Sequence, residues 1–405
     1  MEFESDVLQI PDYRLSQKEF LLANTSEASA RAAIFEELAS EITEANMGPY
    51  YKYLHEQYSD FPYVESVYEK LNAANEEQLS VLQARVKEAE SDEESELDVV
   101  QTNLKLAEYY TTIIDRQNAT DTYKKTLELT SNTGYKIDML LTLTRVEFFF
   151  NDFHEAAKYL EQIKQLSDKG GDWERRNRFK TYNGLYLMAT RNFAEASGLL
   201  IDSLATFTSS EVCSYEQIAH YAIVTGVLSL SRTELKSKII DSPEILSIYS
   251  SAPELEPLVN LTNTLYTCQY NCLFEYLLQT YDQLLVPNKY LAQHANYFLR
   301  ELRCKAYRQL LESYKSLSLK SMARNFNISE EFLDNDLCKF IPNKKLNCTI
   351  DKVNGIIETT RPDNKNSQYH LLIKQGDGLL TKLQKYGAAV KLSGAEPYSP
   401  SMNTH

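Results

Sequence analysis

Along most of the chain, apolar residues recur every three or four positions, which is the spacing of one face of an α-helix. In the stretch 64–90 the apolar positions are Val64, Val67, Leu71, Leu79, Leu82 and Val86. They predict one long, mostly polar helix. The segments 28–42 and 47–58 predict two shorter helices before it, and residues from about 99 to 285 predict helix after helix joined by short turns.

A short motif repeats within this helical stretch at an interval of 40 residues. The segment NDFHEAAKYLEQI (151–163) aligns with RNFAEASGLLIDS (191–203) at phenylalanine, glutamate, alanine and leucine. CQYNCLFEYLL (268–278) is a weaker third copy, with Tyr270 at the aromatic position. We interpret the aromatic residue as lying in the turn, the small residue as allowing close helix approach and the leucine as facing the stack. The pattern predicts a right-handed array of helical hairpins of the tetratricopeptide (TPR) type.

The pattern changes near residue 315. LKSMARNF (319–326) and EEFLDNDLCKFI (330–341) predict two short helices, and Ser329 is a good N-cap for the second. A strand and a hairpin follow, with apolar positions at Leu346, Cys348, Ile350, Ile356 and Ile357. Two helices and a hairpin predict a winged helix, and a hairpin edge is a surface that another sheet can extend.

The connection between the two strands of this hairpin can be predicted from charge. A two-residue turn at Asn354-Gly355 would place Asp351 opposite Glu358, and like charges directly across a hairpin are unfavourable. We therefore predict a longer loop, from about Lys352 to Gly355, with the glycine at positive φ.

Residues 364–389 predict one further helix. Its apolar stripe consists of Tyr369, Leu372, Ile373, Leu379, Leu380 and Leu383. Gly376 and Gly378 lie within this helix, and each costs an isolated helix about 1 kcal/mol. Such a helix is marginal alone, so we expect its stripe to bind partner helices.

Five segments are therefore predicted: an acidic N-terminal helical region (1–98), TPR-like repeats (99–314), a winged helix (315–361), a C-terminal helix (364–389) and a disordered tail (390–405).

Composition and charge narrow the function classes. The chain has 405 residues, 43% of them hydrophobic, with little glycine and proline (12 and 11) and 28 tyrosines, which favours long helices with aromatic packing. The net charge is −15, and residues 1–100, with 23 acidic and 7 basic residues, account for it. The run 88–98 is read either as a solvated linker or as an acidic interaction patch. We find no signal peptide and no apolar run of the roughly 18–20 residues that a membrane span needs, and expect the cytoplasm and nucleus as location.

Catalytic and metal-binding motifs are not evident, so we expect no enzyme, cofactor or metal site. The six histidines are scattered, and Cys268 and Cys272 are interpreted as packing residues. Gly170-Gly171 is interpreted as the end of one helix and Asp172 as the cap of the next. The arginines that follow either contact a partner or form ion pairs; they are Arg175, Arg176 and Arg178.

The winged helix does not have the charge of a DNA reader. Its second helix, residues 329–340, carries four acidic residues and only Lys339 as a base, a net charge of −3. Such a helix repels phosphate, so we expect no nucleic acid as partner.

Three stretches carry a resemblance to a known family: GGDWERRNRFKTYNGLY, LNCTIDKVNGIIETTRPD and NSQYHLLIKQGDGLL. With the helical array before them they resemble the PCI-domain subunits of the 26S proteasome lid, in particular the family called non-ATPase regulatory subunit 6 in animals and regulatory particle non-ATPase subunit 7 in yeast. The resemblance implies a non-catalytic scaffold for lid assembly in ubiquitin-dependent protein degradation. It implies contacts with other PCI subunits through the winged helix, with a lid helical bundle through the last helix, and with the ATPase base. The alternatives are the equivalent subunit of the COP9 signalosome and, further away, a DNA-binding regulator.

Overall fold

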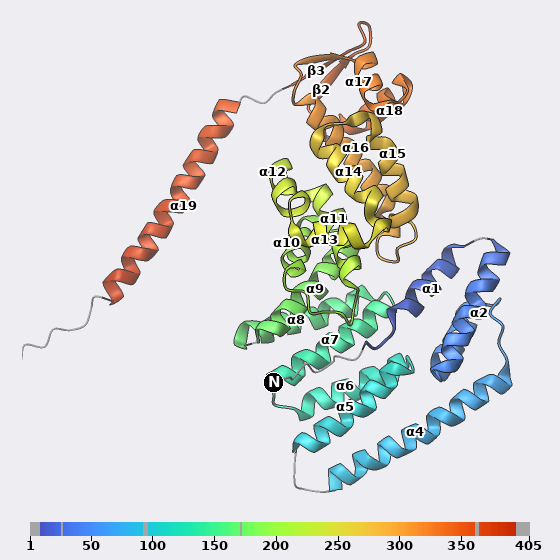
Figure 1. Cartoon of the computed structure of the whole chain (residues 1–405). Coiled ribbons are helices and arrows are strands. Elements are labelled where there is room, and N and C mark those ends of the chain that lie inside the picture. Colours follow the sequence, from blue (N-terminus) through green and yellow to red (C-terminus); the bar gives the residue numbers. More distant parts are fainter. Residues whose placement is uncertain (1–8, 26, 92–95, 171, 361–363, 394–405) are drawn as a thin grey trace, which may run out of the picture. The chain divides into compact units, whose positions relative to one another are not determined.

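The structure is a computed structural model of the chain (Figure 1) that describes residues 9–25, 27–91, 96–170, 172–360 and 364–393. Contacts divide the chain into two compact units, residues 1–306 and 307–405. Among the described helices, none is both long and apolar enough to cross a membrane.

The first unit consists of helices. In chain order they are α1 (Tyr13–Asn24), α2 (Ala28–Glu44), α3 (Gly48–Gln57), α4 (Glu65–Ser91), α5 (Glu96–Thr112), α6 (Arg116–Leu129), α7 (Thr133–Phe149), α8 (Phe153–Gly170), α9 (Trp173–Ala189), α10 (Phe193–Leu204), α11 (Tyr215–Ser229), α12 (Arg232–Leu235), α13 (Pro243–Ser251), α14 (Glu256–Thr267), α15 (Tyr270–Thr280) and α16 (Ala295–Leu311), which runs across the boundary. Short π and 3₁₀ turns lie between some of them: η1 (Lys236–Ile240), η2 (Pro253–Leu255), η3 (Tyr281–Leu285) and η4 (Ala292–His294). The long helix predicted over 64–90 is confirmed as α4.

One backbone turn recurs in this unit. The hairpins α2–α3, α5–α6, α7–α8, α9–α10 and α14–α15 each turn through a single residue with positive φ, respectively Asn46, Ile114, Asn151, Arg191 and Cys268. In every case the next residue donates its backbone N–H to a carbonyl five residues earlier, as Asp152 does to Glu147 (2.9 Å). This is the Schellman motif, which satisfies helix-terminal carbonyls and reverses the chain.

The predicted repeat is confirmed as three of these hairpins, with one adjustment. Phe153, Phe193 and Tyr270 are the first residues of α8, α10 and α15, so they follow the turn instead of lying in it. Ala156 and Ala196 are fully buried in the hairpins, as expected for small residues at a close helix contact. Gly184 of α9 is a further contact of this kind, because a Cβ there would come within 2.8 Å of Leu200 on α10.

Helix α1, which the apolar pattern did not reveal, packs against segments far away in the chain. The Tyr13 hydroxyl donates to the backbone carbonyl of Arg145 (2.8 Å), and the Ser16 hydroxyl donates to that of Phe149 (3.0 Å). Lys289 is buried beside them and donates to the carbonyls of Phe149 (2.6 Å) and Phe148 (3.1 Å) and to the Ser16 hydroxyl. One ammonium group therefore joins α1, the end of α7 and the segment before η4.

The second unit holds a small sheet and three helices: β1 (Ser316–Ser318), α17 (Leu319–Phe326), α18 (Glu330–Phe340), β2 (Cys348–Asp351), β3 (Ile356–Thr359) and α19 (Asn364–Ser393). The sheet is antiparallel with the order β1-β3-β2. The residues that lie fully buried under it include Met322, Phe326, Leu333, Leu337 and Ile357. The predicted winged helix is thus present, with β1 as a strand that the three-residue pattern was too short to signal.

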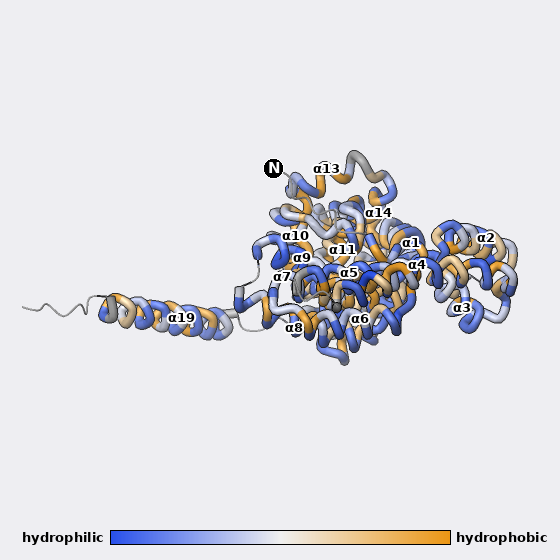
Figure 2. Tube along the Cα trace, turned by 90° about the horizontal axis from the view of Figure 1, so that it is seen from below, coloured by the Kyte–Doolittle hydropathy of each residue, from blue (hydrophilic) through white to orange (hydrophobic). Residues whose placement is uncertain are grey.

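The predicted C-terminal helix forms and extends four residues beyond 389, to Ser393. The rest of the predicted tail, residues 394–405, lies outside the described residues, as do residues 92–95 of the acidic run. In Figure 2 the tube of α19 alternates between hydrophobic and hydrophilic residues along its whole length.

The buried ammonium group of Lys289 predicts a pH dependence. Burial lowers its pKa from 10.5 to about 7, partly offset by Glu19. Between these values the unfolded chain binds a proton that the folded chain does not, so folding stability rises with pH. We expect the free energy of unfolding of the wild type, relative to that of Lys289→Met, to rise by up to about 1.4 kcal/mol per pH unit above pH 7. Below pH 7 this difference should not change with pH. Chemical unfolding of both proteins from pH 6 to 9 measures this, and a difference that does not vary with pH would contradict it.

Candidate partner-binding surfaces

The hairpin of the winged helix has the predicted four-residue loop. Asp351 pairs with Ile356 and Thr349 with Glu358, so no two acids lie opposite each other. Gly355 has φ +65, as expected. The Asp351 carboxylate accepts the side-chain amide of Asn354 (2.7 Å) and the N–H of Val353 (2.9 Å), and these bonds lower its pKa. The loop is therefore held by its own side chains.

Sheet register decides which edge is free. Thr359 donates to the carbonyl of Lys315 and Leu319 donates to that of Gly355, so β1 covers one side of β3. On the other side Thr360 donates to the carbonyl of Asn347. Because antiparallel pairs alternate, residues 347, 349 and 351 bond to β3, whereas the backbone groups of Cys348 and Ile350 point to the outer edge of β2. Among the described strands, none covers that edge.

The side chains proposed from sequence for this edge face mostly inward. Leu346, Cys348 and Ile357 are buried, with exposed fractions of 3%, 4% and 0%. Burial raises the pKa of the Cys348 thiol to about 11. Ile350 and Ile356 are half-buried. Their role in partner binding remains a prediction, and at this edge it would rest on backbone groups more than on side chains.

The acidic helix α18 is attached to the hairpin. Its N-cap Ser329 accepts the N–H of Phe332 (3.2 Å). Lys352 in the loop forms an ion pair with Asp334 (2.9 Å), and this pair uses one of the few bases of the wing. Glu330 and Glu331 are exposed in the first turn, where the helix dipole favours them. The surface that a DNA-reading winged helix would turn to phosphate is therefore acidic here.

The second predicted surface, the stripe of α19, is exposed. Its side chains have exposed fractions between 56% and 66% and comprise Tyr369, Leu372, Ile373, Leu379, Leu380 and Leu383. Residues 365–391 are exposed throughout. The helix is thus present, and what covers its stripe remains a prediction.

The arginine cluster of α9 forms ion pairs inside the first unit. Arg178 donates to Glu211 (2.9 Å) and to Asp138 (3.2 Å), and Arg175 donates to the same Asp138 (2.8 Å). The Tyr182 hydroxyl donates to Glu211 (2.9 Å), and burial beside this carboxylate raises the pKa of Tyr182. The ion-pair interpretation of Arg175 and Arg178 is confirmed. Glu211 was missed, because nothing in its local sequence signals a buried acid.

The two helix ends beside this turn agree with the sequence interpretation, and Gly171 lies outside the described residues. Helix α8 ends at Gly170, and Asp172 caps α9 by accepting the N–H of Trp173 (2.8 Å). Arg176 donates to the carbonyl of Ser167 (3.2 Å). Gly170 and Asp172 are therefore the end of one helix and the cap of the next.

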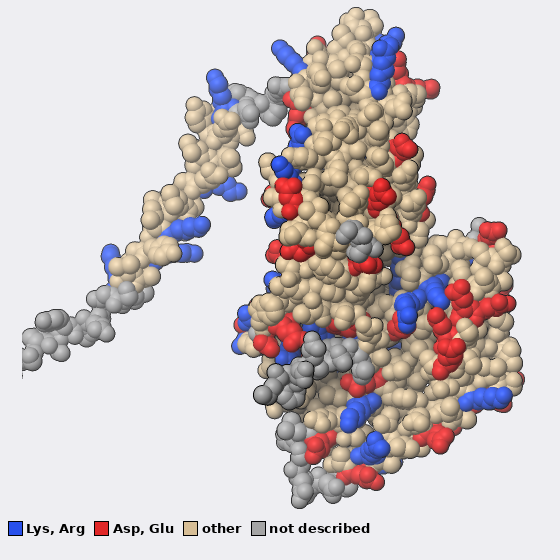
Figure 3. Space-filling view, viewed as in Figure 1, with Lys and Arg blue, Asp and Glu red and all other residues tan. Residues whose placement is uncertain are grey.

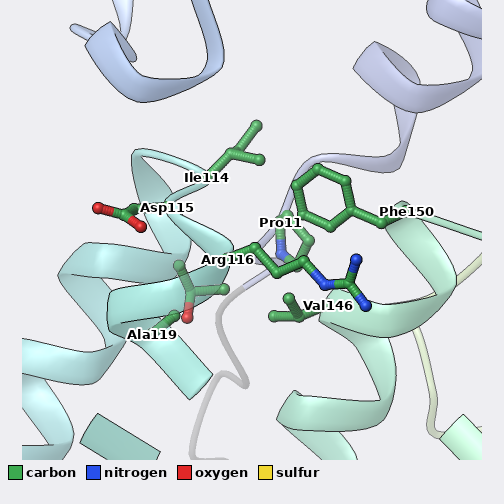
Figure 4. A pocket seen from close by; sticks show the side chains of 8 residues that line it. Pro11, Ile114, Asp115, Arg116, Ala119, Val146 and Phe150 are labelled. Carbon is green, nitrogen blue, oxygen red and sulfur yellow. The ribbon is translucent and has the colours of Figure 1, made fainter. Parts of the chain in front are cut away.

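Two concave features lie among the described residues. A cavity of about 10 Å³ lies near Arg116 and Pro11, with room for about one water. Figure 4 shows the Arg116 guanidinium near the Phe150 ring. Its distance to the ring centroid is 5.4 Å, and it forms ion pairs with Glu147 and Asp152. A wider groove of about 460 Å³ runs beside Trp173, Asn177 and Lys180. In the described part of the chain, no three His, Cys, Asp or Glu side chains are grouped to hold a metal ion.

Comparison with known proteins covers most of the chain. The family described as "26S proteasome subunit RPN7" matches residues 65–238, the PCI domain matches 278–361, and "26S proteasome regulatory subunit RPN7/PSMD6 C-terminal helix" matches 368–390. The chain is 52% identical to the 26S proteasome regulatory subunit RPN7 of Saccharomyces cerevisiae, over 96% of either protein. It is 39% identical to rpn7 of Schizosaccharomyces pombe, over 94% of the chain and 96% of the relative. COP9 signalosome complex subunit 1 of Arabidopsis thaliana is 24% identical, over 63% of the chain and 57% of the relative.

Neighbouring isoleucines of β3 provide a test of the winged-helix core. Ile357→Asp buries an unpaired carboxylate and should lower the free energy of unfolding of this unit by more than about 3 kcal/mol. Ile356→Lys places a base opposite Asp351 on the outer face and should change it by less than about 1 kcal/mol. Thermal melts of the full chain compare the two variants, and limited proteolysis, scored for cleavage beyond residue 306, reports on the stability of this unit. Equal destabilisation by both substitutions would contradict the register.

Proposed function

Because the chain belongs to the family of the 26S proteasome regulatory subunit RPN7, we propose that it is a non-catalytic structural subunit of the proteasome lid. The observation that carries the proposal is identity with the yeast protein over nearly the full length of both chains. The match of residues 368–390 to the family of the RPN7/PSMD6 C-terminal helix supports the proposal further, since we propose that this helix takes part in lid assembly. The signalosome alternative is disfavoured by the lower identity and partial coverage.

Two surfaces would carry the scaffold role. The outer edge of β2 offers free backbone N–H and C=O groups, and we propose that the sheet of a neighbouring PCI subunit extends it. The stripe of α19 would enter a bundle of helices from other lid subunits. The acidic N-terminal region, 1–98, would reach the ATPase base, and the TPR-like repeats, 99–314, would hold these parts at fixed spacing. The protein would act in the cytoplasm and nucleus, in ubiquitin-dependent degradation.

The lid scaffold assignment predicts that α19 is needed for assembly and dispensable for folding. Residues 365–391 are exposed, so deleting 364–393 removes few contacts. We expect the truncated chain to melt at the same temperature as the full chain and to be absent from purified lids. Deletion of 394–405 alone is the control and should leave incorporation unchanged. Normal entry of the chain that lacks 364–393 would overturn this role of α19.

The edge assignment predicts a separate defect. Ile350→Pro removes the N–H that points to the outer edge of β2 without removing a bond to β3. We expect the lid to form with weaker attachment of the neighbouring PCI subunit, by up to about tenfold for one lost backbone hydrogen bond. Ile350→Val keeps the N–H and is the matched control. Native mass spectrometry under increasing salt measures the attachment, and equal behaviour of the two variants would exclude this edge.

A further inference from the structure

Helix α19 presents one wide apolar face. The large side chains on it have exposed fractions between 56% and 73% and are Tyr369, Leu372, Ile373, Leu379, Leu380, Leu383, Tyr386 and Val390. They recur at intervals of three and four residues, and two such series overlap, one through Leu372 and Leu379 and one through Ile373 and Leu380. A single series is the seam for one partner helix, so two series provide a face for at least two.

The charge on α19 is opposite to that of the rest of the protein. The helix carries five lysines and one aspartate, a net charge of +4 in a chain of net charge −15. Figure 3 shows lysines along its length. Lys382 lies one turn from both Leu379 and Tyr386, so it borders the apolar face, whereas Lys374 lies one turn from His370 and Gly378 on the other side. Charge complementarity therefore favours partner helices with acidic residues beside their apolar seam.

Glycine interrupts the middle of this face. Gly376 lies one turn from Leu372, Ile373, Leu379 and Leu380, all of them apolar. A Cβ at this position would have no atom within 4 Å, so nothing in the described chain requires a glycine there. Gly387 lies three turns further along the same face, one turn from Leu383 and Val390. Glycine weakens a helix, so at these positions it provides something that a larger residue does not.

Gly378 differs from Gly376 in one respect. The residues one turn away from it are Lys374, Gln375, Thr381 and Lys382, all polar. It therefore lies on the solvent side of the same helix, two residues from Gly376 and with the same helix propensity. A substitution at Gly378 changes the helix as much as one at Gly376 and leaves the apolar face intact.

We propose that the apolar face of α19 is a notched binding surface for acidic amphipathic helices of other lid subunits, and that a large apolar side chain of a partner sits over Gly376. The inference rests on the proposed function, in which α19 joins a helical bundle. The notch lets the partner backbone come close at one level of the face, and Gly387 marks a second such level. Both fix the register in which the helices pack, because a shift along the axis would place the large side chain against leucine.

Competition between two copies of the full chain tests the notch. Cells express the wild type together with Gly376→Leu or Gly378→Leu, regulatory particles are purified through another subunit, and mass spectrometry gives the ratio of variant to wild type relative to the extract. A leucine over the notch should lower the ratio for Gly376→Leu about tenfold or more, as overpacking does. The ratio for Gly378→Leu should stay near one. Equal ratios for the two variants overturn the notch.

The same assay tests the charge of the partner. Lys382→Glu at the border of the face should lower the ratio, and Lys374→Glu, with the same change in net charge, should not. Equal loss from both overturns the acidic helix as partner. Sedimentation with phosphatidylserine vesicles adds an alternative outcome, because a basic amphipathic helix also binds anionic membranes. The proposal is overturned if both lysine substitutions weaken vesicle binding alike and both variants enter the lid normally.

Failure of the notch and failure of the proposed function give different results. If the chain that lacks 364–393 enters the lid normally, α19 is not an assembly element and the proposed function of this helix fails. If that chain is excluded while Gly376→Leu and Gly378→Leu enter equally, α19 binds its partners through a face without a notch.

Discussion

The helical array depends on one backbone constraint, the single left-handed residue that closes each hairpin. In the described residues, every non-glycine residue with positive φ ends a helix through this turn; Asn327 does so between α17 and α18, and Lys344 does so between α18 and β2, where no helix follows. Such a conformation costs an L-residue roughly 1–2 kcal/mol. In the five hairpins of the first unit the turn offsets this cost, because it satisfies carbonyls at the helix end. The next helix begins two residues after the turn residue. Ile114 illustrates the balance, since its β-branched side chain is strained at this φ yet buried in the core.

The repeated motif could be read from the sequence because its signal lies in side chains that pack. The alanine and leucine positions of α8 and α10 are buried in both copies, and the aromatic position is buried at Phe193 and half-buried at Phe153, so selection by packing leaves a visible pattern. The turn residue itself could not be read. Asparagine, isoleucine, arginine and cysteine all occupy it, because the hydrogen bonds that define the turn are made by the backbone. A search for glycine, the usual residue for this conformation, finds none of the five hairpins of the first unit.

Elements held by distant contacts were the ones that the sequence did not reveal. Helix α1 is fixed by Lys289, whose buried position follows only from the packed array. Strand β1 has three residues, too few for a period, and exists because β3 offers it a partner. The candidate edge shows both sides of this limit. The loop Lys352–Gly355 followed from local charge, whereas the direction of the backbone groups of β2 depends on the register that β1 and β3 set together. Glu211 likewise meets Arg178 only through the stacking of hairpins.

Helices α7 and α19 differ in whether their apolar side chains are buried within the chain. Helix α7 is buried over most of its surface, so its leucines and phenylalanines contribute to the free energy of folding within the chain. Helix α19 is longer, yet its apolar side chains remain in water and its glycines lower its intrinsic helicity. Nothing in the described chain buries the apolar area of α19, and we propose that helices of other chains remove it from water. Its burial then also has to offset the ordering of a weak helix, which lowers the affinity for every partner, so only a partner that buries much of the apolar face binds stably. Under this proposal α19 selects its partner by fit, and the glycines that weaken the isolated helix are compatible with a close fit in the assembly.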